Sequence, residues 1–157
     1  MPSTVSDGQV TMSEPAPMHF PTHVTIPSDL EVAHELQTQI ERQLQSATTF
    51  SEMEIFSIKL ALEEAIVNAI KHGNQMDRDK SVRVAYRVDT HRFDIMIVDE
   101  GPGFDPEDVP DPTAPENLER PCGRGLLLMR HYMNHIEYIG TGNTVVMSKW
   151  SLNGKVG

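Results

Sequence analysis

The sequence predicts an α+β fold, a two-layer α/β sandwich in which a mixed, mostly antiparallel sheet carries its helices on one face. Between residues 29 and 72 the apolar residues recur at helical spacing, whereas segments within 81–98 and 135–150 have strand patterns. Within each of these pairs the two strands follow one another closely along the chain, which favours antiparallel pairing. The expected order is one strand, two helices, two strands, a long loop, a short helix and two final strands.

The first strand and the first helix are expected between residues 19 and 46. Segment 19–26 (HFPTHVTI) alternates in part, and its Pro21 fits a strand at the edge of a sheet. Ser28-Asp-Leu-Glu31 has the spacing of a capping box, which satisfies free N–H groups at a helix start. A helix is predicted from Asp29 to about Ser46, with an apolar face made of Leu30, Ala33, Leu36, Ile40 and Leu44.

The second helix is expected to begin after another capping box, Ser51-Glu-Met-Glu54, and to end at about His72. Gly73-Asn74 then supplies a C-terminal stop signal. Apolar residues occur nearly all round this helix, which predicts burial on more than one side.

The remaining elements lie on either side of a long loop. Strands are predicted at 81–88 and 93–98, and a short helix at about 125–133 precedes strands near 135–139 and 144–150, joined by a hairpin turn at 140–143. Residues 99–124 contain six of the eleven prolines, and eight acidic residues lie between Asp99 and Glu119 without any Lys or Arg. A loop this long inside a compact domain is usually functional or disordered.

Length and composition predict one domain in a cytoplasmic protein. The 157 residues fit a single core at 19–152, with a flexible tail at 1–18 and a short tail at 153–157. We expect no signal peptide and no membrane span, and the single cysteine, Cys122, excludes an internal disulfide. A formal net charge of −10 disfavours nucleic acid and anionic membranes as partners, because both are bound mainly through Lys and Arg.

A row of polar residues interrupts the apolar second helix. Glu64, Asn68 and His72 are spaced i, i+4 and i+8, so they lie on one side of a helix. An Asn oxygen is a suitable ligand for Mg²⁺, and a Glu one turn away can accept a proton from a nearby hydroxyl or water. The alternatives are a solvent-facing stripe and, for His72, a structural histidine, while Glu63 is expected to be solvated or ion-paired.

Two further motifs suggest a ligand site. Asp99-Glu-Gly-Pro-Gly103 directly follows an apolar strand; there Asp99 can accept a hydrogen bond from an amine, and the glycines permit close approach of a flat ligand. Gly123-Arg-Gly125 opens the predicted short helix, where free backbone N–H groups and Arg124 favour an anion. Taken alone, each motif also fits an ordinary turn or helix entry.

Together, the three motifs and their order resemble the N, G1 and G2 boxes of the GHKL ATPases, which share the Bergerat ATP-binding fold. The matching segments are EAIVNAIKHG at 64–73, DEGPG at 99–103 and GRGLLLM at 123–129. Over residues 20–152 the chain is most similar to the anti-sigma factor serine kinases of bacteria. The first 18 residues have no counterpart in that pattern.

The resemblance implies roles for individual residues. Glu64 would be the catalytic base, Asn68 would hold Mg²⁺ at the ATP phosphates, and Asp99 would bind the adenine amine. Residues 104–124 would form a lid over ATP, and Thr144 would help Asp99 through a water molecule. The full set implied to bind the cofactor is Asn68, His72, Asp99, Gly101, Gly103, Gly123, Arg124, Gly125, Leu126 and Thr144.

The implied function is that of a Mg-ATP-dependent protein serine kinase acting as an anti-sigma regulatory factor. Its implied partners are an anti-anti-sigma protein of the STAS type, phosphorylated on serine, and a sigma factor; the family often forms homodimers. An alternative is a non-catalytic ATP-binding module that controls a partner by nucleotide-dependent ordering of the lid. Two further hypotheses are a fragment of a sensor histidine kinase, with His34 as phosphoacceptor, and a purely structural scaffold.

Overall fold

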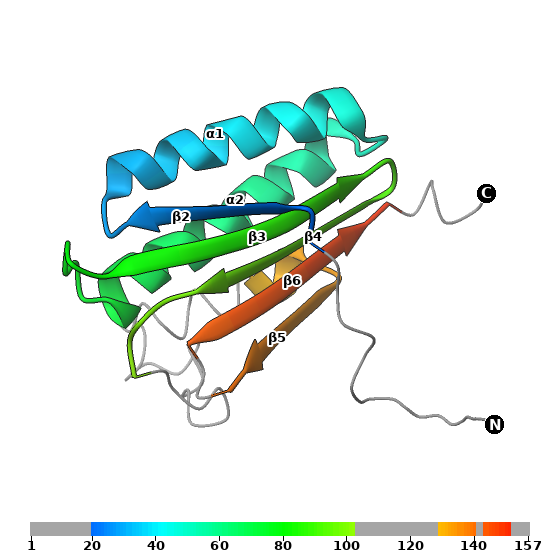
Figure 1. Cartoon of the computed structure of the whole chain (residues 1–157). Coiled ribbons are helices and arrows are strands. Elements are labelled where there is room, and N and C mark those ends of the chain that lie inside the picture. Colours follow the sequence, from blue (N-terminus) through cyan, green and yellow to red (C-terminus); the bar gives the residue numbers. More distant parts are fainter. Residues whose placement is uncertain (1–19, 103–128, 141–142, 152–157) are drawn as a thin grey trace, which may run out of the picture.

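The computed structural model describes residues 20–102, 129–140 and 143–151, which form a sheet with helices on one face (Figure 1). The sheet has five strands in the order β2-β3-β4-β6-β5, and every pairing is antiparallel. The predicted α+β sandwich is thus confirmed, with β2 at one edge as expected. The elements are β2 (Thr22–Pro27), α1 (Leu30–Ala47), α2 (Glu52–Asn68), the π-helical turn η2 (Ala69–Gly73), β3 (Ser81–Asp89), β4 (Arg92–Val98), β5 (His135–Ile139) and β6 (Thr144–Trp150).

Helix α1 begins differently from the predicted capping box. Its N-cap is Asp29, whose carboxylate accepts hydrogen bonds from the backbone N–H groups of Glu31 and Val32. Ser28 is fully buried and donates instead to the carbonyl of Lys80, so the expected cap at Ser28 is wrong. The spacing of Ser28 and Glu31 could not reveal this, because Ser28 is held by a residue that is distant in sequence.

Helix α2 begins at the predicted capping box, since the Ser51 hydroxyl and the Glu54 carboxylate each accept a hydrogen bond from the other residue's backbone N–H. Its burial is less complete than its composition suggests, because Met53 is 72% exposed and Phe56 is 50% exposed. The helix ends in the π-helical turn, in which the N–H of Asn74 donates to the carbonyl of Ala69. A π-helical segment is rare and often occurs at a functional site.

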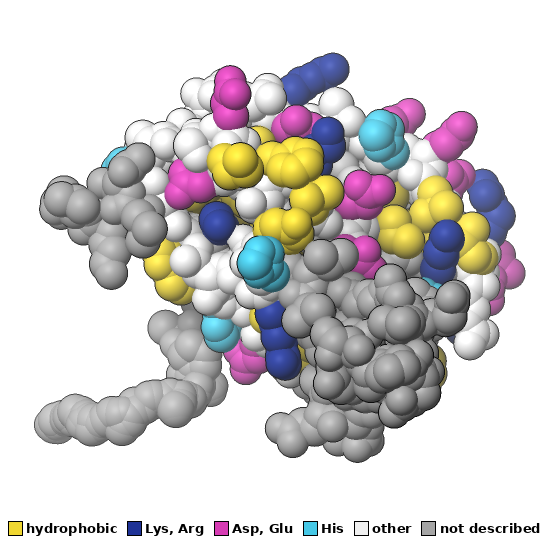
Figure 2. All heavy atoms as spheres, turned by 180° about the vertical axis from the view of Figure 1, so that it is seen from behind, with side chains coloured by type: hydrophobic (Ala, Val, Ile, Leu, Met, Phe, Trp, Pro, Cys, Tyr) yellow, Lys and Arg dark blue, Asp and Glu magenta, His cyan; other side chains and the backbone are white. Residues whose placement is uncertain are grey.

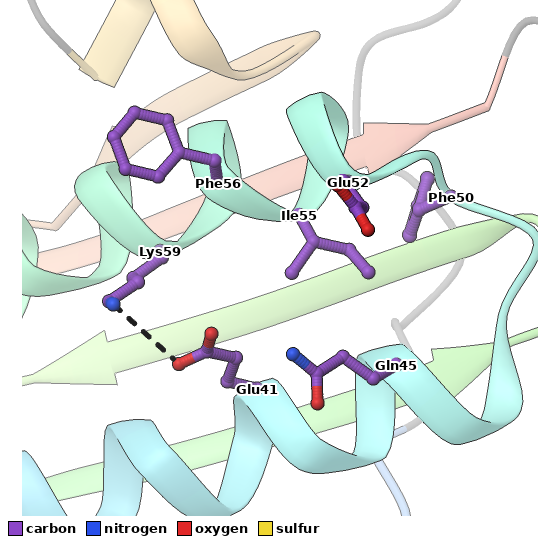
Figure 3. Close-up of a pocket in the computed structure, with 7 residues that line it drawn as sticks. All are labelled: Glu41, Gln45, Phe50, Glu52, Ile55, Phe56 and Lys59. Carbon is purple, nitrogen blue, oxygen red and sulfur yellow. Dashed lines mark ion pairs between the residues drawn. The ribbon is translucent and has the colours of Figure 1, made fainter.

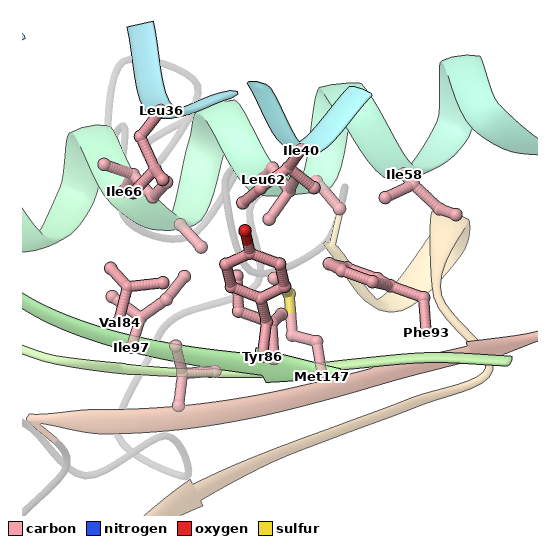
Figure 4. Close-up of a cluster of buried hydrophobic side chains, with 14 of the residues drawn as sticks. Leu36, Ile40, Ile58, Leu62, Ile66, Val84, Tyr86, Phe93, Ile97 and Met147 are labelled. Carbon is pink, nitrogen blue, oxygen red and sulfur yellow. The ribbon is translucent and has the colours of Figure 1, made fainter. Parts of the chain in front are cut away.

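The hydrophobic core lies between the sheet and the two long helices (Figure 4). Side chains alternate along β3, so Val82, Val84 and Tyr86 face the helices and are almost completely buried. The predicted face of α1 is buried at Ala33, Leu36, Ile40 and Leu44, whereas Leu30 is 36% exposed. Met129 and Met133 close the core from the segment that precedes β5.

The opposite face of the sheet holds a buried carboxylate that the sequence did not single out. Asp94 on β4 is fully buried and forms ion pairs with Arg87 at 2.8 Å and Arg92 at 3.0 Å. The hydroxyl of Ser148 on β6 also donates to it. A buried charge needs such partners, because desolvation would otherwise be prohibitive.

Several expectations fall outside the described part of the chain. These are the two tails, at 1–18 and 153–157, the lid at 104–124, the beginning of the short helix and the centre of the hairpin turn. Residues 129–132 are helical, as predicted for the end of that short helix. None of the helices in the described ranges is long and apolar enough to cross a membrane.

Candidate functional site

The candidate site lies at the end of the sandwich where α2 ends, β3 begins and β4 ends, on the left in Figure 1. Antiparallel pairing brings the end of β4 beside the start of β6, because Val98 is the partner of Thr144. We call segment 64–73, at the end of α2 and in η2, the N-box helix. It lies at the same end of the sheet as Asp99, which follows β4, and Thr144, which begins β6.

Glu64 and Asn68 interact across one turn of α2. Both side chains are half-buried, and the Asn68 side chain lies near enough to the Glu64 carboxylate to influence its pKa. Burial raises the pKa of Glu64 above its ordinary value, while the nearby Asn68 side chain works in the opposite direction. Glu63 is exposed, so burial separates the two adjacent glutamates as the helical spacing predicted.

His72 lies in the π-helical turn, one turn beyond Asn68, and its side chain is exposed. It remains near enough to Glu64 that a charged imidazole would lower the pKa of that carboxyl. The structure therefore places His72 at the exposed, C-terminal end of the polar row, after the two half-buried residues Glu64 and Asn68.

Asp99 packs directly against the end of the N-box helix. A Cβ placed on Gly73 would lie 2.3 to 2.5 Å from the carboxyl atoms of Asp99, so any other residue at this position would displace the Asp99 carboxylate. A Cβ on Gly101 would lie 2.1 Å from the carbonyl oxygen of Gly73. The N–H of Gly101 donates to the Asp99 carboxylate at 2.7 Å, and burial raises the pKa of Asp99 despite this bond.

The start of β6 holds the backbone of Asp99 through Asn143. The N–H of Asp99 donates to the carbonyl of Asn143, and the Asn143 amide donates back to the carbonyl of Asp99, both at 3.0 Å. Thr144 is half-buried, and its hydroxyl lies 3.5 Å from the side-chain oxygen of Asn143. At the start of β6, the direct hydrogen bonds to Asp99 thus come from Asn143, the residue before Thr144.

Five of the predicted site residues lie outside the described part of the chain: Gly103, Gly123, Arg124, Gly125 and Leu126. The described residues bring together Asp99, Gly101 and the end of the N-box helix, with Thr144 beside them. The phosphate-binding half of the predicted site stays a prediction.

The residues present fit a magnesium ion held mainly by a nucleotide. Among the described residues, no cluster of three or more His, Cys, Asp or Glu side chains could bind a metal by itself. The half-buried amide of Asn68 offers one hard oxygen ligand. Mg²⁺ usually takes few protein ligands and completes its coordination with phosphate oxygens and water.

A groove of about 470 Å³ between α1 and α2 is separate from this site (Figure 3). Lys59 and Glu41 form an ion pair of 3.9 Å across it, and Phe50 and Ile55 lie at its other end. No predicted site residue lines it. Seen from behind, the molecule carries apolar groups among acidic and basic side chains (Figure 2), and the groove likewise has a mixed polar and apolar lining that does not by itself indicate a catalytic site.

Sequence reasoning missed two residues of the site, Asn74 and Asn143. The sequence predicts only a helix stop at Asn74, yet its side chain is fully buried and accepts a hydrogen bond from the backbone N–H of Glu100 at 2.7 Å. For Asn143 the sequence predicts only a place in a hairpin turn. A carboxamide directly after His-Gly, or directly before a strand, gave no signal of these distant contacts.

The fold and the site define the class of protein as an ATP-binding domain of the GHKL type. Its helices cover one face of an antiparallel sheet, and Asp99 packs against Gly73 at the end of the N-box helix. A family model described as a histidine kinase-like ATPase domain matches residues 26–149. The chain belongs to this family, and its relatives agree with the anti-sigma kinase branch that the motifs resemble.

Curated relatives cover about two thirds of the chain. A serine-protein kinase RsbW of Oceanobacillus iheyensis is 30% identical over 108 residues, which are 64% of this chain and 68% of the relative. The protein of the same name from Bacillus subtilis is 31% identical over 109 residues, 65% and 68% of the two chains. An anti-sigma F factor of Halalkalibacterium halodurans is 36% identical over 103 residues, 61% and 69% of the two chains.

Proposed function

We propose that the chain is a Mg-ATP-dependent protein serine kinase that acts as an anti-sigma regulatory factor. The observation that carries this proposal is the Glu64–Asn68 pair, a half-buried carboxylate one turn from a half-buried carboxamide, on the helical segment that ends against Asp99. Relatives named as serine-protein kinases and anti-sigma factors support the same reading.

In this mechanism ATP binds with its adenine at Asp99. The carboxylate accepts a hydrogen bond from the exocyclic amine, and Gly73 and Gly101 keep side chains out of the space beside it. Asn68 would hold Mg²⁺, which neutralises phosphate charge when bound. The N–H groups at Gly123 and Gly125, together with Arg124 and Leu126, are proposed to contact the phosphates.

Glu64 is the proposed general base. Its carboxylate takes the proton of a substrate serine while the serine oxygen forms a bond to the γ-phosphorus. The bond from that phosphorus to the β,γ-bridging oxygen breaks, and ADP leaves with the electron pair. A pKa raised by burial suits this role, because a carboxylate with a higher pKa is a stronger base.

The proposed protein partners are an anti-anti-sigma protein of the STAS type, which carries the substrate serine, and a sigma factor that the kinase sequesters. A homodimer, a cytoplasmic location and a kinase domain at 19–152 flanked by short tails belong to the same proposal. The names of the relatives, serine-protein kinase and anti-sigma F factor, support the kinase activity and a sigma factor as partner at the level of the family.

The test is transfer of γ-labelled phosphate from ATP to a STAS-type protein encoded beside this chain. We expect phosphoserine with the wild-type protein and with Glu63→Gln, whose exposed side chain is the matched control. Glu64→Gln should lower the transfer rate at least about 100-fold, as expected for loss of a general base. Equal labelling by Glu64→Gln, or no phosphoserine with the wild-type protein, would overturn the kinase assignment.

A second candidate is regulation without catalysis, and a relative named anti-sigma F factor is compatible with control of a partner by binding. In that case ATP binds and changes the affinity for the partner, but no phosphate is transferred. Calorimetry with and without nucleotide separates the two readings, because unchanged partner affinity contradicts the non-catalytic module.

A further inference from the structure

The side chain of Asn74 is fully buried just after the π-helical turn, and its whole amide is hydrogen-bonded. Its nitrogen donates to the hydroxyl of Ser28 and to the carbonyl of Ser81, both at 3.0 Å. Its oxygen accepts the backbone N–H of Glu100 at 2.7 Å. The orientation of the amide is fixed, because a carbonyl can only accept and a backbone N–H can only donate.

These bonds form a closed ring around the start of β3. The Asn74 amide donates to the carbonyl of Ser81, the N–H of Ser81 donates to the Glu100 carboxylate at 2.7 Å, and the N–H of Glu100 returns to Asn74. The ring joins three segments: the end of the N-box helix, the first residue of β3 and the residue that follows Asp99. Each member restrains the other two.

The ring bears directly on Asp99. Asn74 holds the peptide group on the C-terminal side of Asp99, and Asn143 holds the backbone N–H and carbonyl of Asp99 itself. The carboxylate then lies between the Gly101 N–H and the Cα of Gly73. Because Gly73 immediately precedes Asn74, one short segment contacts both the side chain of Asp99 and the peptide beside it.

The backbone after Asn74 is strained. Gln75 and Met76 have φ values of 54° and 60°, in the left-handed region that residues with a Cβ rarely occupy. The N–H of Met76 donates to the carbonyl of Ile70, which closes this turn. Such strain persists where the surrounding contacts determine it, and it often occurs beside functional sites.

We propose that Asn74 is a positioning residue of the nucleotide site, which sets the orientation of the Asp99 carboxylate and thereby the preference for adenine. The inference rests on the proposed function, in which Asp99 receives the exocyclic amine. Asn74 does not touch the nucleotide in this proposal. It acts by fixing the peptide between Asp99 and Glu100.

The experiment compares binding of Mg-ATP with binding of the Mg-bound triphosphate of purine riboside, which lacks the exocyclic amine. We expect the wild-type protein to prefer ATP by at least about tenfold, because a site built to receive an N–H group rejects a ligand without it. In Asn74→Ala this preference should fall to about threefold or less, because the carboxylate loses its alignment. Affinity for the analogue should change less than affinity for ATP.

Ser28→Ala is the matched control. It removes another partner of the same buried amide, and also the bond from Ser28 to Lys80, but it leaves the contact with Glu100 in place. We expect a lower melting temperature and an unchanged preference for ATP. A full wild-type preference in folded Asn74→Ala, or an equal loss in Ser28→Ala, would overturn the positioning role.

Hydrogen exchange in the full-length wild-type protein covers the case in which Asn74→Ala does not fold. The amide of Glu100 should be protected without nucleotide, and exchange at the rate of an open chain would contradict the proposal. The failures are distinguishable: a wild-type protein that binds neither nucleotide overturns the proposed function. Discrimination that persists in the folded variant overturns the role of Asn74 alone.

Discussion

Replacing Gly101 by alanine should break the contact between the end of the N-box helix and the strand end that carries Asp99. The added Cβ would lie 2.1 Å from the carbonyl oxygen of Gly73, 2.6 Å from its carbonyl carbon and 2.8 Å from its Cα. All three atoms belong to the backbone, so no side-chain rotation relieves the overlap. The chain must separate at this point.

The magnitude follows from the size of that overlap. Overpacking of a well-packed region costs typically about 1–3 kcal/mol, and we expect about 3 kcal/mol because backbone atoms meet backbone atoms. For a chain of this length that loss lowers the melting temperature by about 6–12 °C. Displacement of Asp99 should also weaken ATP binding at least about tenfold.

Gly140→Ala is the comparison, measured with the same thermal melts and ATP titrations. Gly140 has a φ of +68°, and a Cβ there would meet nothing within 4 Å. This variant should lose only about 1 kcal/mol of stability through its left-handed backbone and should bind ATP normally. A Gly101→Ala protein that melts within 2 °C of the wild type and binds ATP equally would refute the close approach of Gly73 and Gly101.

Three further predictions concern stability. Burial raises the pKa of Asp99, so the folded protein holds that proton more tightly than the unfolded chain and stability falls as pH rises through the folded pKa. Asp99→Asn should therefore stabilise the nucleotide-free protein by roughly 0.5 kcal/mol at neutral pH, after allowing for partial exposure, and should abolish ATP binding. The gain should disappear towards pH 4, and a lower melting temperature than wild type at neutral pH would contradict it. Asp94→Ala should cost about 1–3 kcal/mol in urea unfolding, because the buried hydroxyl of Ser148 loses its acceptor and two half-exposed arginine side chains lose their partner. A loss below about 0.5 kcal/mol would show that the contacts of Asp94 do not stabilise the fold. Gln75→Gly and Met76→Gly should each raise the free energy of unfolding by about 0.5–1 kcal/mol, because glycine adopts positive φ without strain, and no gain in either would argue against the left-handed turn.

The sequence by itself determined the succession of elements and the motifs of the site. Periodicity is a local property, so the spacing of Ala33, Leu36, Ile40 and Leu44 was enough to predict both the helix and its buried face. The capping box at Ser51 was also local, since its two bonds join residues three apart. The separation of Glu63 from Glu64 followed from helical geometry alone.

The tertiary structure decided what the polar residues contact. Asp29, and not Ser28, is the N-cap of α1, because the hydroxyl of Ser28 donates to the carbonyl of Lys80, which lies near Ser28 in space. The bonds that place Asp99 and the residue after it span 26 and 44 residues, and the bond from Asn74 to Ser28 spans 46. The π-helical turn likewise depends on how the end of α2 meets β3 and β4.

The physical reason for this division lies in the range of the forces that each prediction uses. Helix and strand patterns arise from the burial of side chains a few residues apart, and one sequence displays them directly. A buried carboxamide such as Asn74 must find partners wherever the fold supplies them, and its local sequence does not name them. The sequence therefore predicted which residues could bind a nucleotide, and only the folded chain showed how Gly73 and Asn74 hold Asp99 in place.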